Sequence, residues 1–432
     1  MRPHHPPPLQ RPALAAALVL WLLAGCAGGG GGDGASKAGS PAGATPPAIT
    51  LTGNDGSSTG EATDGSAPPA GATPPFTSGL EPVAVVDGTL RYPVKLATTA
   101  QGRLLVADAG HHRVLMYPGI PEALGAPALL AVGQAAPEGQ APSPGTLSWP
   151  LGVATAGSRM AVADTFNHRV LLFNQIPSAS GAMADIVLGQ PDTASNTPGC
   201  APGQMQLPFG VALTDEGRVL VADTVNNRVL VWHQWPTRHG QPPDAVIGQA
   251  GASTCAINDA DGDGNPDASL SGAGLYFPGA VWTDGTRVLV ADTNNSRVLA
   301  WDRLPGPGEH GRPADRVLGQ RNLAGRALND RDGDGVSDAP SAATLHRPAD
   351  VHSDGTRVVV ADEFNHRVLV WNAWPATNGA AADAVLGQPD FASATPGNGR
   401  QGMNAPRGVL LRGARLVVSD GENHRLLVFT AP

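Results

Sequence analysis

The stretch PFGVALTDEGRVLVADTVNNRVLVW, residues 208–232, determines the fold of this chain. It contains three short apolar segments, of which the first follows Pro208, the second ends at Asp223 and the third begins at Arg228. Gly217 separates the first two segments, and the sequence Asp-x-x-Asn-x-Arg separates the second from the third. Both separators are typical of turns, so the stretch predicts three consecutive antiparallel strands.

The same pattern occurs six times, and in each copy an Asp precedes an Arg by five positions. The second strands and their turns lie at 104–113, 160–169, 219–228, 288–297, 358–367 and 416–425. A fourth apolar segment follows in five copies and ends in Gly-Gln, at Gln134, Gln190, Gln249, Gln320 and Gln388. Four short strands per unit, repeated in this way, predict an all-β protein, a six-bladed β-propeller of four-stranded antiparallel blades.

Ring closure is predicted at the sixth copy. This copy ends after its third strand at Phe429, close to the end of the chain, so it has no fourth strand of its own. Residues 82–88 match the fourth-strand pattern, which reads DAVLGQ at 383–388. We therefore expect this N-terminal strand to complete the last blade, because closure removes an exposed strand edge.

The residues before 79 are not expected to belong to the propeller. Residues 1–25 contain an apolar run that is too short to cross a bilayer and is typical of a signal peptide. The run ends in Leu-Ala-Gly before Cys26, which resembles the lipobox of bacterial lipoproteins and implies lipidation of Cys26; a secretory signal with a chance cysteine is the alternative. Residues 26–78 are rich in Gly, Ser, Pro, Ala and Thr and are predicted to be a disordered tether. The implied location is a bacterial membrane, with the protein facing the periplasm or the cell exterior and the outer membrane favoured where the host has one.

Composition and charge restrict the partners. Asp and Glu number 37 against 28 for Lys and Arg, and a formal net charge of −9 gives no electrostatic attraction to nucleic acid. We expect a monomer that contacts the membrane through its lipid anchor only.

The stretch at 208–232 resembles an NHL repeat over nearly its whole length, and the resemblance covers the chain from about residue 79 onward. It implies a six-bladed propeller of residues 79–432. Six-bladed relatives include a peptidylglycine-amidating lyase and lactonase-like or strictosidine-synthase-like proteins with a metal in the channel. Propellers of this kind carry many unrelated activities, so the resemblance implies the fold and leaves the chemistry open.

The Asp, Asn and Arg of the second-to-third strand turn could form a functional ring, or they could satisfy turn amides and pair with one another. Their repetition in every copy favours the structural role. The position just before the Arg of this turn is a histidine in four copies, His112, His168, His366 and His424. These histidines are interpreted as exposed turn residues rather than metal ligands.

Two acidic insertions lie between a Gly-Gln strand end and the next Pro, and both read D-x-D-x-D-G-x-x-D. This spacing is similar to the first half of an EF-hand loop and to thrombospondin type 3 repeats, which implies calcium. Position 12 is Leu270 in one loop and Ser341 in the other, so the bidentate Glu of an EF-hand is missing. Calcium is the prediction, a solvated acidic loop is the alternative, and no zinc or organic cofactor is expected. The predicted ligands are Asp259, Asp261, Asp263 and Asp267 in the first loop and Asp330, Asp332, Asp334 and Asp338 in the second.

Other departures from the repeat lie in the connections between a fourth strand and the next first strand. Insertions occur near 191–206, 250–275, 321–345 and 389–403. Cys200 and Cys255 lie in two of these connections. An oxidising compartment permits a disulfide between them, and two free thiols are the alternative.

The innermost strands carry four polar residues where most copies have small or apolar ones. Lys95 and Asp350 stand two positions after a Pro, His352 follows in blade five, and Arg407 stands one position after a Pro in blade six. Because blades five, six and one are neighbours in a closed ring, we expect these residues to gather at the channel mouth as a small-ligand site. Channel-lining side chains surrounded by water are the alternative.

Alternating strand direction places the second-to-third strand turns, the insertions and the channel mouth on one face. We therefore predict a binding or scaffold module that holds a protein, peptide or glycan outside the cell membrane. The alternative is a metal-dependent propeller enzyme, lyase-like or lactonase-like, with its site at the channel mouth. A lyase-type zinc site needs several histidines, whereas the innermost strands offer only His352, and no Ser-His-Asp or Cys-His arrangement can be assigned.

Overall fold

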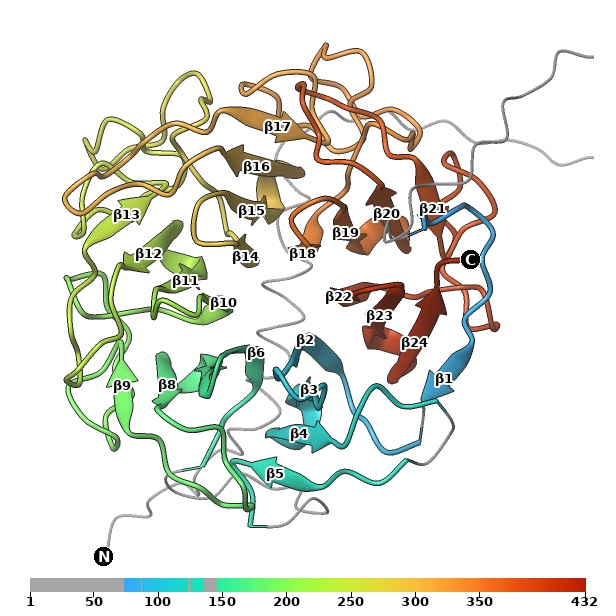
Figure 1. Ribbon diagram of the computed structural model, residues 1–432. Coiled ribbons are helices and arrows are strands. Elements are labelled where there is room, and N and C mark those ends of the chain that lie inside the picture. Colours follow the sequence, from blue (N-terminus) through green and yellow to red (C-terminus); the bar gives the residue numbers. More distant parts are fainter. Residues whose placement is uncertain (1–73, 87, 123–125, 136–145) are drawn as a thin grey trace, which may run out of the picture. The chain divides into compact units, whose positions relative to one another are not determined.

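The strand pattern of the repeats forms a ring of sheets in the computed structural model, which describes residues 74–86, 88–122, 126–135 and 146–432. The described strands make six four-stranded sheets, arranged as the blades of a propeller (Figure 1). The predicted all-β, six-bladed β-propeller is confirmed. The predicted signal peptide, the lipidation site Cys26 and residues 26–73 of the tether lie outside the described residues.

In blades one to three the strands follow the chain from the innermost to the outermost position (Figure 1). Blade one consists of β2 (Pro93–Thr98), β3 (Leu104–Asp108), β4 (Arg113–Tyr117) and β5 (Leu130–Val132). Blade two consists of β6 (Pro150–Ala156), β7 (Arg159–Asp164), β8 (Arg169–Phe173) and β9 (Ile186–Leu188). Blade three consists of β10 (Pro208–Leu213), β11 (Val219–Asp223), β12 (Arg228–Trp232) and β13 (Ala245–Ile247).

Blades four and five repeat this order, and blade six takes its outer strand from the N-terminal side of the chain. Blade four consists of β14 (Ala280–Thr283), β15 (Val288–Asp292), β16 (Arg297–Trp301) and β17 (Arg316–Leu318). Blade five consists of β18 (Pro348–Ser353), β19 (Val358–Asp362), β20 (Arg367–Trp371) and β21 (Ala384–Leu386). Blade six consists of β22 (Pro406–Arg412), β23 (Arg415–Asp420), β24 (Arg425–Thr430) and β1 (Ala84–Val86).

Near-continuous Val, Leu and Ala in the second and third strands reflects burial on both faces of each blade. Every residue of β11 and β12 is buried, for example. One apolar cluster combines side chains of blades three and four, and another combines blades five and six, so the core lies between neighbouring blades. Strands packed on both faces do not need the polar alternation of a half-exposed strand.

Connections between the antiparallel strands alternate between two faces of the ring. We call one the loop face, which carries the second-to-third strand turns and the connections from a fourth strand to the next first strand. The hairpin face carries the first-to-second strand hairpins and the third-to-fourth strand connections. Each second-to-third strand turn is a short 3-10 helix, and these are η1 (Ala109–His111), η2 (Thr165–Asn167), η3 (Thr224–Asn226), η4 (Thr293–Asn295), η5 (Glu363–Asn365) and η6 (Gly421–Asn423). No helix in the described ranges has the length and apolar character needed to cross a bilayer.

The Asp and Arg at the two ends of each 3-10 turn form a buried ion pair. In blade three, Arg228 Nε lies 2.8 Å from Asp223 Oδ2, and both side chains are fully buried. Asn226 donates to the same carboxylate oxygen at 2.8 Å, and the backbone N–H of Gln206 donates to Oδ1 at 2.7 Å. Arg228 also donates to the Gln204 carbonyl. Equivalent pairs occur in the other blades, so these residues hold the loop-face connections on the blades.

The residue after each 3-10 turn joins its blade to the next one. His168 has a left-handed backbone, with φ of 53°, and its Nδ1 accepts a hydrogen bond from the N–H of Leu207 at 3.1 Å. Asn227 accepts the equivalent bond from Phe277 at 3.0 Å. The other histidines of this slot, His112, His366 and His424, accept the same inter-blade bond. The expectation of plain exposed turn residues is therefore wrong for His112, His168 and His366, which are half-buried, because the left-handed backbone directs the ring to the neighbouring blade.

The outer strand of blade six closes the ring as predicted. Its three residues pair antiparallel with β24, as Ala84 with Val428, Val85 with Leu427 and Val86 with Leu426. The pairing covers the outer edge of β24, which would otherwise be free.

Residues 74–83 lead into β1 and replace the third-to-fourth strand connection of the other blades. Phe76 is 1% exposed and packs in the cluster between blades five and six. Its backbone N–H and carbonyl each make a 2.9 Å hydrogen bond with the Asn372 side chain, and the Arg357 guanidinium lies 5.2 Å from its ring centroid. Ser78 Oγ accepts a hydrogen bond from the N–H of Val385 at 3.0 Å. Residues 74–78 fall within the predicted tether, yet they are held by the propeller.

Candidate functional site

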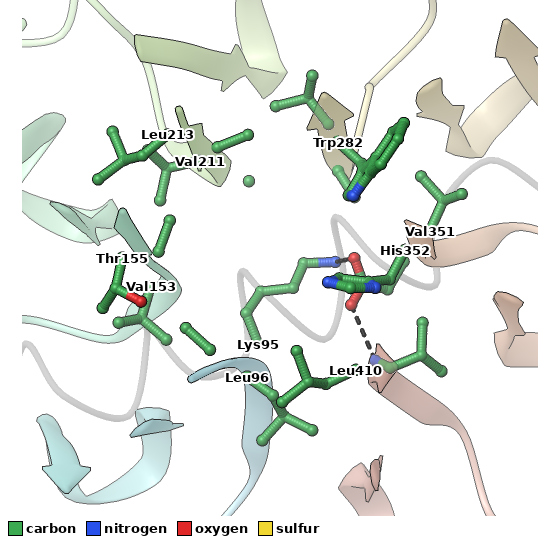
Figure 2. Close-up of a pocket in the computed structure, with 18 of the residues that line it drawn as sticks. Lys95, Leu96, Val153, Thr155, Val211, Leu213, Trp282, Val351, His352 and Leu410 are labelled. Atoms are coloured by element: carbon green, nitrogen blue, oxygen red, sulfur yellow. Dashed lines mark hydrogen bonds and ion pairs between the residues drawn. The ribbon is translucent and has the colours of Figure 1, made fainter. Parts of the chain in front are cut away.

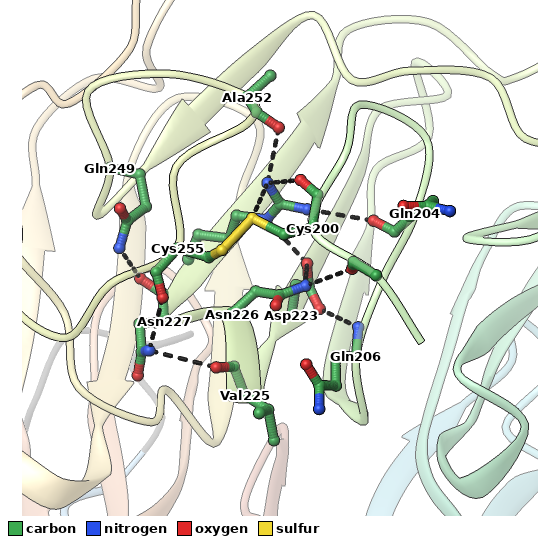
Figure 3. Close-up of polar contacts among 12 residues, drawn as sticks. Cys200, Gln204, Gln206, Asp223, Val225, Asn226, Asn227, Gln249, Ala252 and Cys255 are labelled. Carbon is green, nitrogen blue, oxygen red and sulfur yellow. Dashed lines mark hydrogen bonds and ion pairs between the residues drawn. A yellow bond between two sulfur atoms is a disulfide. The ribbon is translucent and has the colours of Figure 1, made fainter. Parts of the chain in front are cut away.

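A disulfide joins two connections on the loop face. Cys200 lies between blades two and three, Cys255 lies between blades three and four, and their Cα atoms are 6.4 Å apart (Figure 3). Arg228 donates to the Cys200 carbonyl and Asn227 to the Cys255 carbonyl, both at 3.0 Å. The two connections are therefore fixed to each other and to the η3 turn of blade three.

The first acidic loop begins shortly after Cys255. Asp259 is fully buried, and its carboxylate accepts hydrogen bonds from the N–H groups of Gly262 at 2.7 Å and Gly264 at 3.0 Å. Both glycines have positive φ, 78° and 88°, a backbone conformation that glycine adopts without strain. One carboxylate oxygen from each of three residues lies within 4.8 Å of the others, and these residues are Asp259, Asp261 and Asp267. Such a set of oxygen atoms fits a hard divalent cation.

The second acidic loop repeats this geometry. Its cluster consists of Asp330, Asp332 and Asp338, again within 4.8 Å of one another. The fourth predicted ligand of each loop does not join its cluster. Asp263 instead accepts the N–H of Asn265 at 2.7 Å, and Asp334 accepts that of Val336 at 2.8 Å. Within the described residues, these two clusters are the only groups of three side chains placed to share a metal ion.

An asparagine just before each acidic loop ties the loop to the next blade. The side-chain amides of Asn258 and Asn295 exchange two hydrogen bonds, of 3.2 and 2.8 Å, and Asn295 also donates to Asp292 of the buried ion pair. Asn329 and Asn365 form the same amide pair, at 3.0 and 2.8 Å. These residues were not predicted as part of the site. Their signal in the sequence is the repeated Asn-Asp-x-Asp at the start of both loops.

A cavity of about 170 Å³ lies on the propeller axis, between the innermost strands (Figure 2). Its lining reaches Thr98 and Thr283, the last residues of β2 and β14, and excludes the first two residues of β2, β6, β10, β18 and β22. The cavity therefore occupies the half of the channel nearer the hairpin face, which corrects the expectation that this site shares a face with the loops. Most lining residues are Val, Leu and Ala, and the titratable ones are Lys95, Asp350 and His352.

Lys95 reaches across the channel from blade one to blade five (Figure 2). Its Nζ lies 2.7 Å from Asp350 Oδ1 and donates to the Ala349 carbonyl at 2.6 Å. The second carboxylate oxygen of Asp350 accepts the N–H of Val409, in blade six, at 2.9 Å. Burial lowers the pKa of Lys95, and the Asp350 carboxylate opposes this shift. The ion pair thus links three consecutive blades.

His352 makes a second link between blades five and six. Its Nδ1 accepts the N–H of Leu411 at 3.4 Å. Burial lowers the pKa of His352 to about 4, so the imidazole is neutral at pH 7. Because Nδ1 accepts a hydrogen bond, the single ring proton is on Nε2.

Arg407, the fourth predicted residue, does not line the cavity. Its Nη2 lies 2.7 Å from Glu363 Oε1, and its guanidinium lies 4.7 Å from the centroid of the Tyr92 ring. Glu363 is buried, which raises its pKa, while Arg407 opposes the rise. The structure thus brings Lys95, Asp350 and His352 together and gives Arg407 a separate ion pair on the loop-face side.

Glu363 is a charged residue that sequence reasoning missed. It occupies the first position of η5, where blades two, three and four have a threonine that donates, at 2.8 Å, to the carbonyl of a proline at or just before the start of the next blade. The exchange of Thr for Glu is visible in the sequence, but its partner Arg407 lies in the next blade. The pair therefore becomes evident only when the blades are placed side by side.

The NHL repeat family matches residues 90–117 and 205–232. The matched segments contain the first three strands of blade one and of blade three. The chain thus contains NHL repeats within a six-bladed propeller. A comparison with curated proteins finds no significant match.

Proposed function

We propose that this protein is a lipid-anchored, extracytoplasmic binding module or scaffold that recognises a protein, peptide or glycan through its loop face. One observation carries the proposal: the buried Asp–Arg pairs are the same in every blade, whereas the disulfide and both acidic loops occur in loop-face connections. Variable loops held on a uniform, rigid frame are a common arrangement for a recognition surface. The lipobox-like sequence before Cys26 supports the anchor.

Calcium is proposed to hold the two acidic loops in their conformation. Each loop brings three carboxylate oxygens within 4.8 Å of one another, and without a cation these charges repel. An all-oxygen set suits calcium better than zinc, which favours nitrogen and sulfur ligands. The missing position-12 Glu favours weak binding, with a Kd of about 10⁻⁴ to 10⁻³ M as in extracellular calcium modules.

Site-directed photo-crosslinking in the host cell tests which face binds the partner. Full-length protein carries a photoreactive residue in place of Val336, which is 64% exposed in the second acidic loop. The matched control carries it in place of Met183, which is 71% exposed on a hairpin-face connection of blade two. We expect a discrete crosslinked partner at position 336 that is lost when calcium is chelated, and no such product at position 183. Crosslinking at position 183 alone would contradict recognition by the loop face.

A further inference from the structure

The axial cavity contains N–H groups that have no acceptor among the described residues. Trp282 lines the cavity with its indole nitrogen directed inward (Figure 2), and Nε1 makes no hydrogen bond to any described residue. The Nε2 proton of His352 likewise has no acceptor in the described part of the chain, since its Nδ1 makes the bond to Leu411. Lys95 uses two of its three ammonium protons, for Asp350 and for the Ala349 carbonyl.

The negative charge in the cavity is already compensated. Of the residues that the structure describes, Asp350 is the only carboxylate that lines it, and its two oxygens are bound by Lys95 and by the N–H of Val409. Asp350 is therefore already engaged and does not serve as acceptor for the remaining N–H protons of Lys95, His352 and Trp282. N–H groups in a partly desolvated cavity are stabilised by a ligand that supplies acceptors, and most strongly by an anionic one.

We propose that the axial cavity binds a small monocarboxylate. The carboxylate oxygens accept hydrogen bonds from Trp282 Nε1, His352 Nε2 and the third Lys95 proton, and the aliphatic end of the ligand lies against Val153 and Val211. A cavity of about 170 Å³ has room for several water molecules and so for a small organic anion, such as lactate or pyruvate.

This site goes beyond the proposed function and does not depend on it. The cavity lies in the half of the channel nearer the hairpin face, whereas the proposed partner surface consists of loop-face connections. A failure to bind a carboxylate would leave the loop-face proposal unaffected. Equally, a protein with no loop-face partner could still bind a carboxylate here.

Calorimetric titration of the full chain with lactate, compared with lactamide, tests the proposal. Lactamide has nearly the same shape but no charge and one oxygen fewer. We expect lactate to bind at one site per chain and lactamide to bind at least about tenfold more weakly, because hydrogen bonds to a charged acceptor are the stronger ones. An indole ¹⁵N–¹H spectrum locates the site, since the resonance that is absent from Trp282→Phe should shift during the lactate titration.

The Trp282→Phe variant removes the indole N–H and retains an aromatic ring. Its affinity for lactate should fall at least about tenfold, through the loss of one hydrogen bond to a charged acceptor. The matched control is Trp374→Phe, because Trp374 packs on Trp282 at 5.8 Å between ring centroids but does not line the cavity. Circular dichroism and Tm show whether each variant folds. No heat with up to 50 mM lactate, equal binding of lactamide, or equal effects of the two folded variants would each overturn the proposal.

Discussion

Replacing Phe76 by alanine tests whether the segment before β1 is part of the folded propeller. The side chain is 1% exposed, and truncation of a buried Phe costs roughly 3–5 kcal/mol through lost burial and the remaining cavity. The ring also lies 5.2 Å from the Arg357 guanidinium, and loss of that cation–π contact adds about 0.5–1 kcal/mol. We expect Phe76→Ala to lower the free energy of unfolding by about 4 kcal/mol, a large effect for a residue outside every strand.

Equilibrium unfolding in urea, followed by circular dichroism at fixed calcium, measures this change on the full chain. For a domain of this size about 4 kcal/mol corresponds to a fall in Tm of roughly 5 °C. Met183→Ala is the control, because Met183 is 71% exposed and its truncation should change stability by less than about 0.5 kcal/mol. If Phe76→Ala were as stable as Met183→Ala, the N-terminal segment would not be held on the propeller, and the closure of blade six would rest on β1 alone.

Three further expectations concern the loops, the inter-blade joints and the turns. Calorimetry should detect one calcium ion for each acidic loop, and Asp261→Asn or Asp332→Asn should each abolish one of the two sites and leave the other. Burial lowers the pKa of His168 below its usual 6.5. The neutral imidazole therefore makes its full contribution to the free energy of unfolding above pH 6.5, and this contribution is lost as the pH falls through the pKa of the folded state. Between pH 7 and pH 5 the free energy of unfolding should fall less for His168→Asn than for the unchanged protein, since blade three uses Asn in this joint. If the two proteins lost stability equally over this pH range, the role of His168 would be contradicted. Arg297→Met should cost about 3–5 kcal/mol by leaving a buried carboxylate unpaired, whereas Arg303→Met, at a surface ion pair, should have a much smaller effect in the same urea assay.

The fold could be predicted because each blade repeats the residues that form its turns. The Gly-Gln that marked the end of a fourth strand has a physical reason. Gln190 Nε2 donates to the carbonyl of His168, and four other blades make the equivalent bond. The preceding Gly189 has a φ of 87°, which glycine adopts without strain. A local signal of this kind can be read from one repeat and checked in the next.

The parts that could not be predicted depend on contacts between blades. Asn258 and Asn295 are 37 residues apart, and Phe76 is 296 residues from its partner Asn372. The role of His168 requires both its left-handed backbone and an N–H from the next blade. Neither is visible in a repeat taken alone. Polar residues on the innermost strands were predicted correctly from the sequence. Which part of each strand lines the cavity is visible only in the structure, and it shows that the cavity lies toward the hairpin face.

In blade six the chain does not connect the third strand, β24, to the fourth strand, β1. This break has a consequence for how the chain could be rearranged. Phe76 and Ala431 pack in one apolar cluster, so the segment that enters the ring and the segment that ends it meet in the same blade (Figure 1). Every other blade has a covalent third-to-fourth strand connection at the equivalent place. The ring geometry itself does not require the break to be in blade six. A circular permutant that joins the ends in blade six and opens the chain in the connection after β8 would keep every strand pairing and would place both chain ends in blade two instead of blade six.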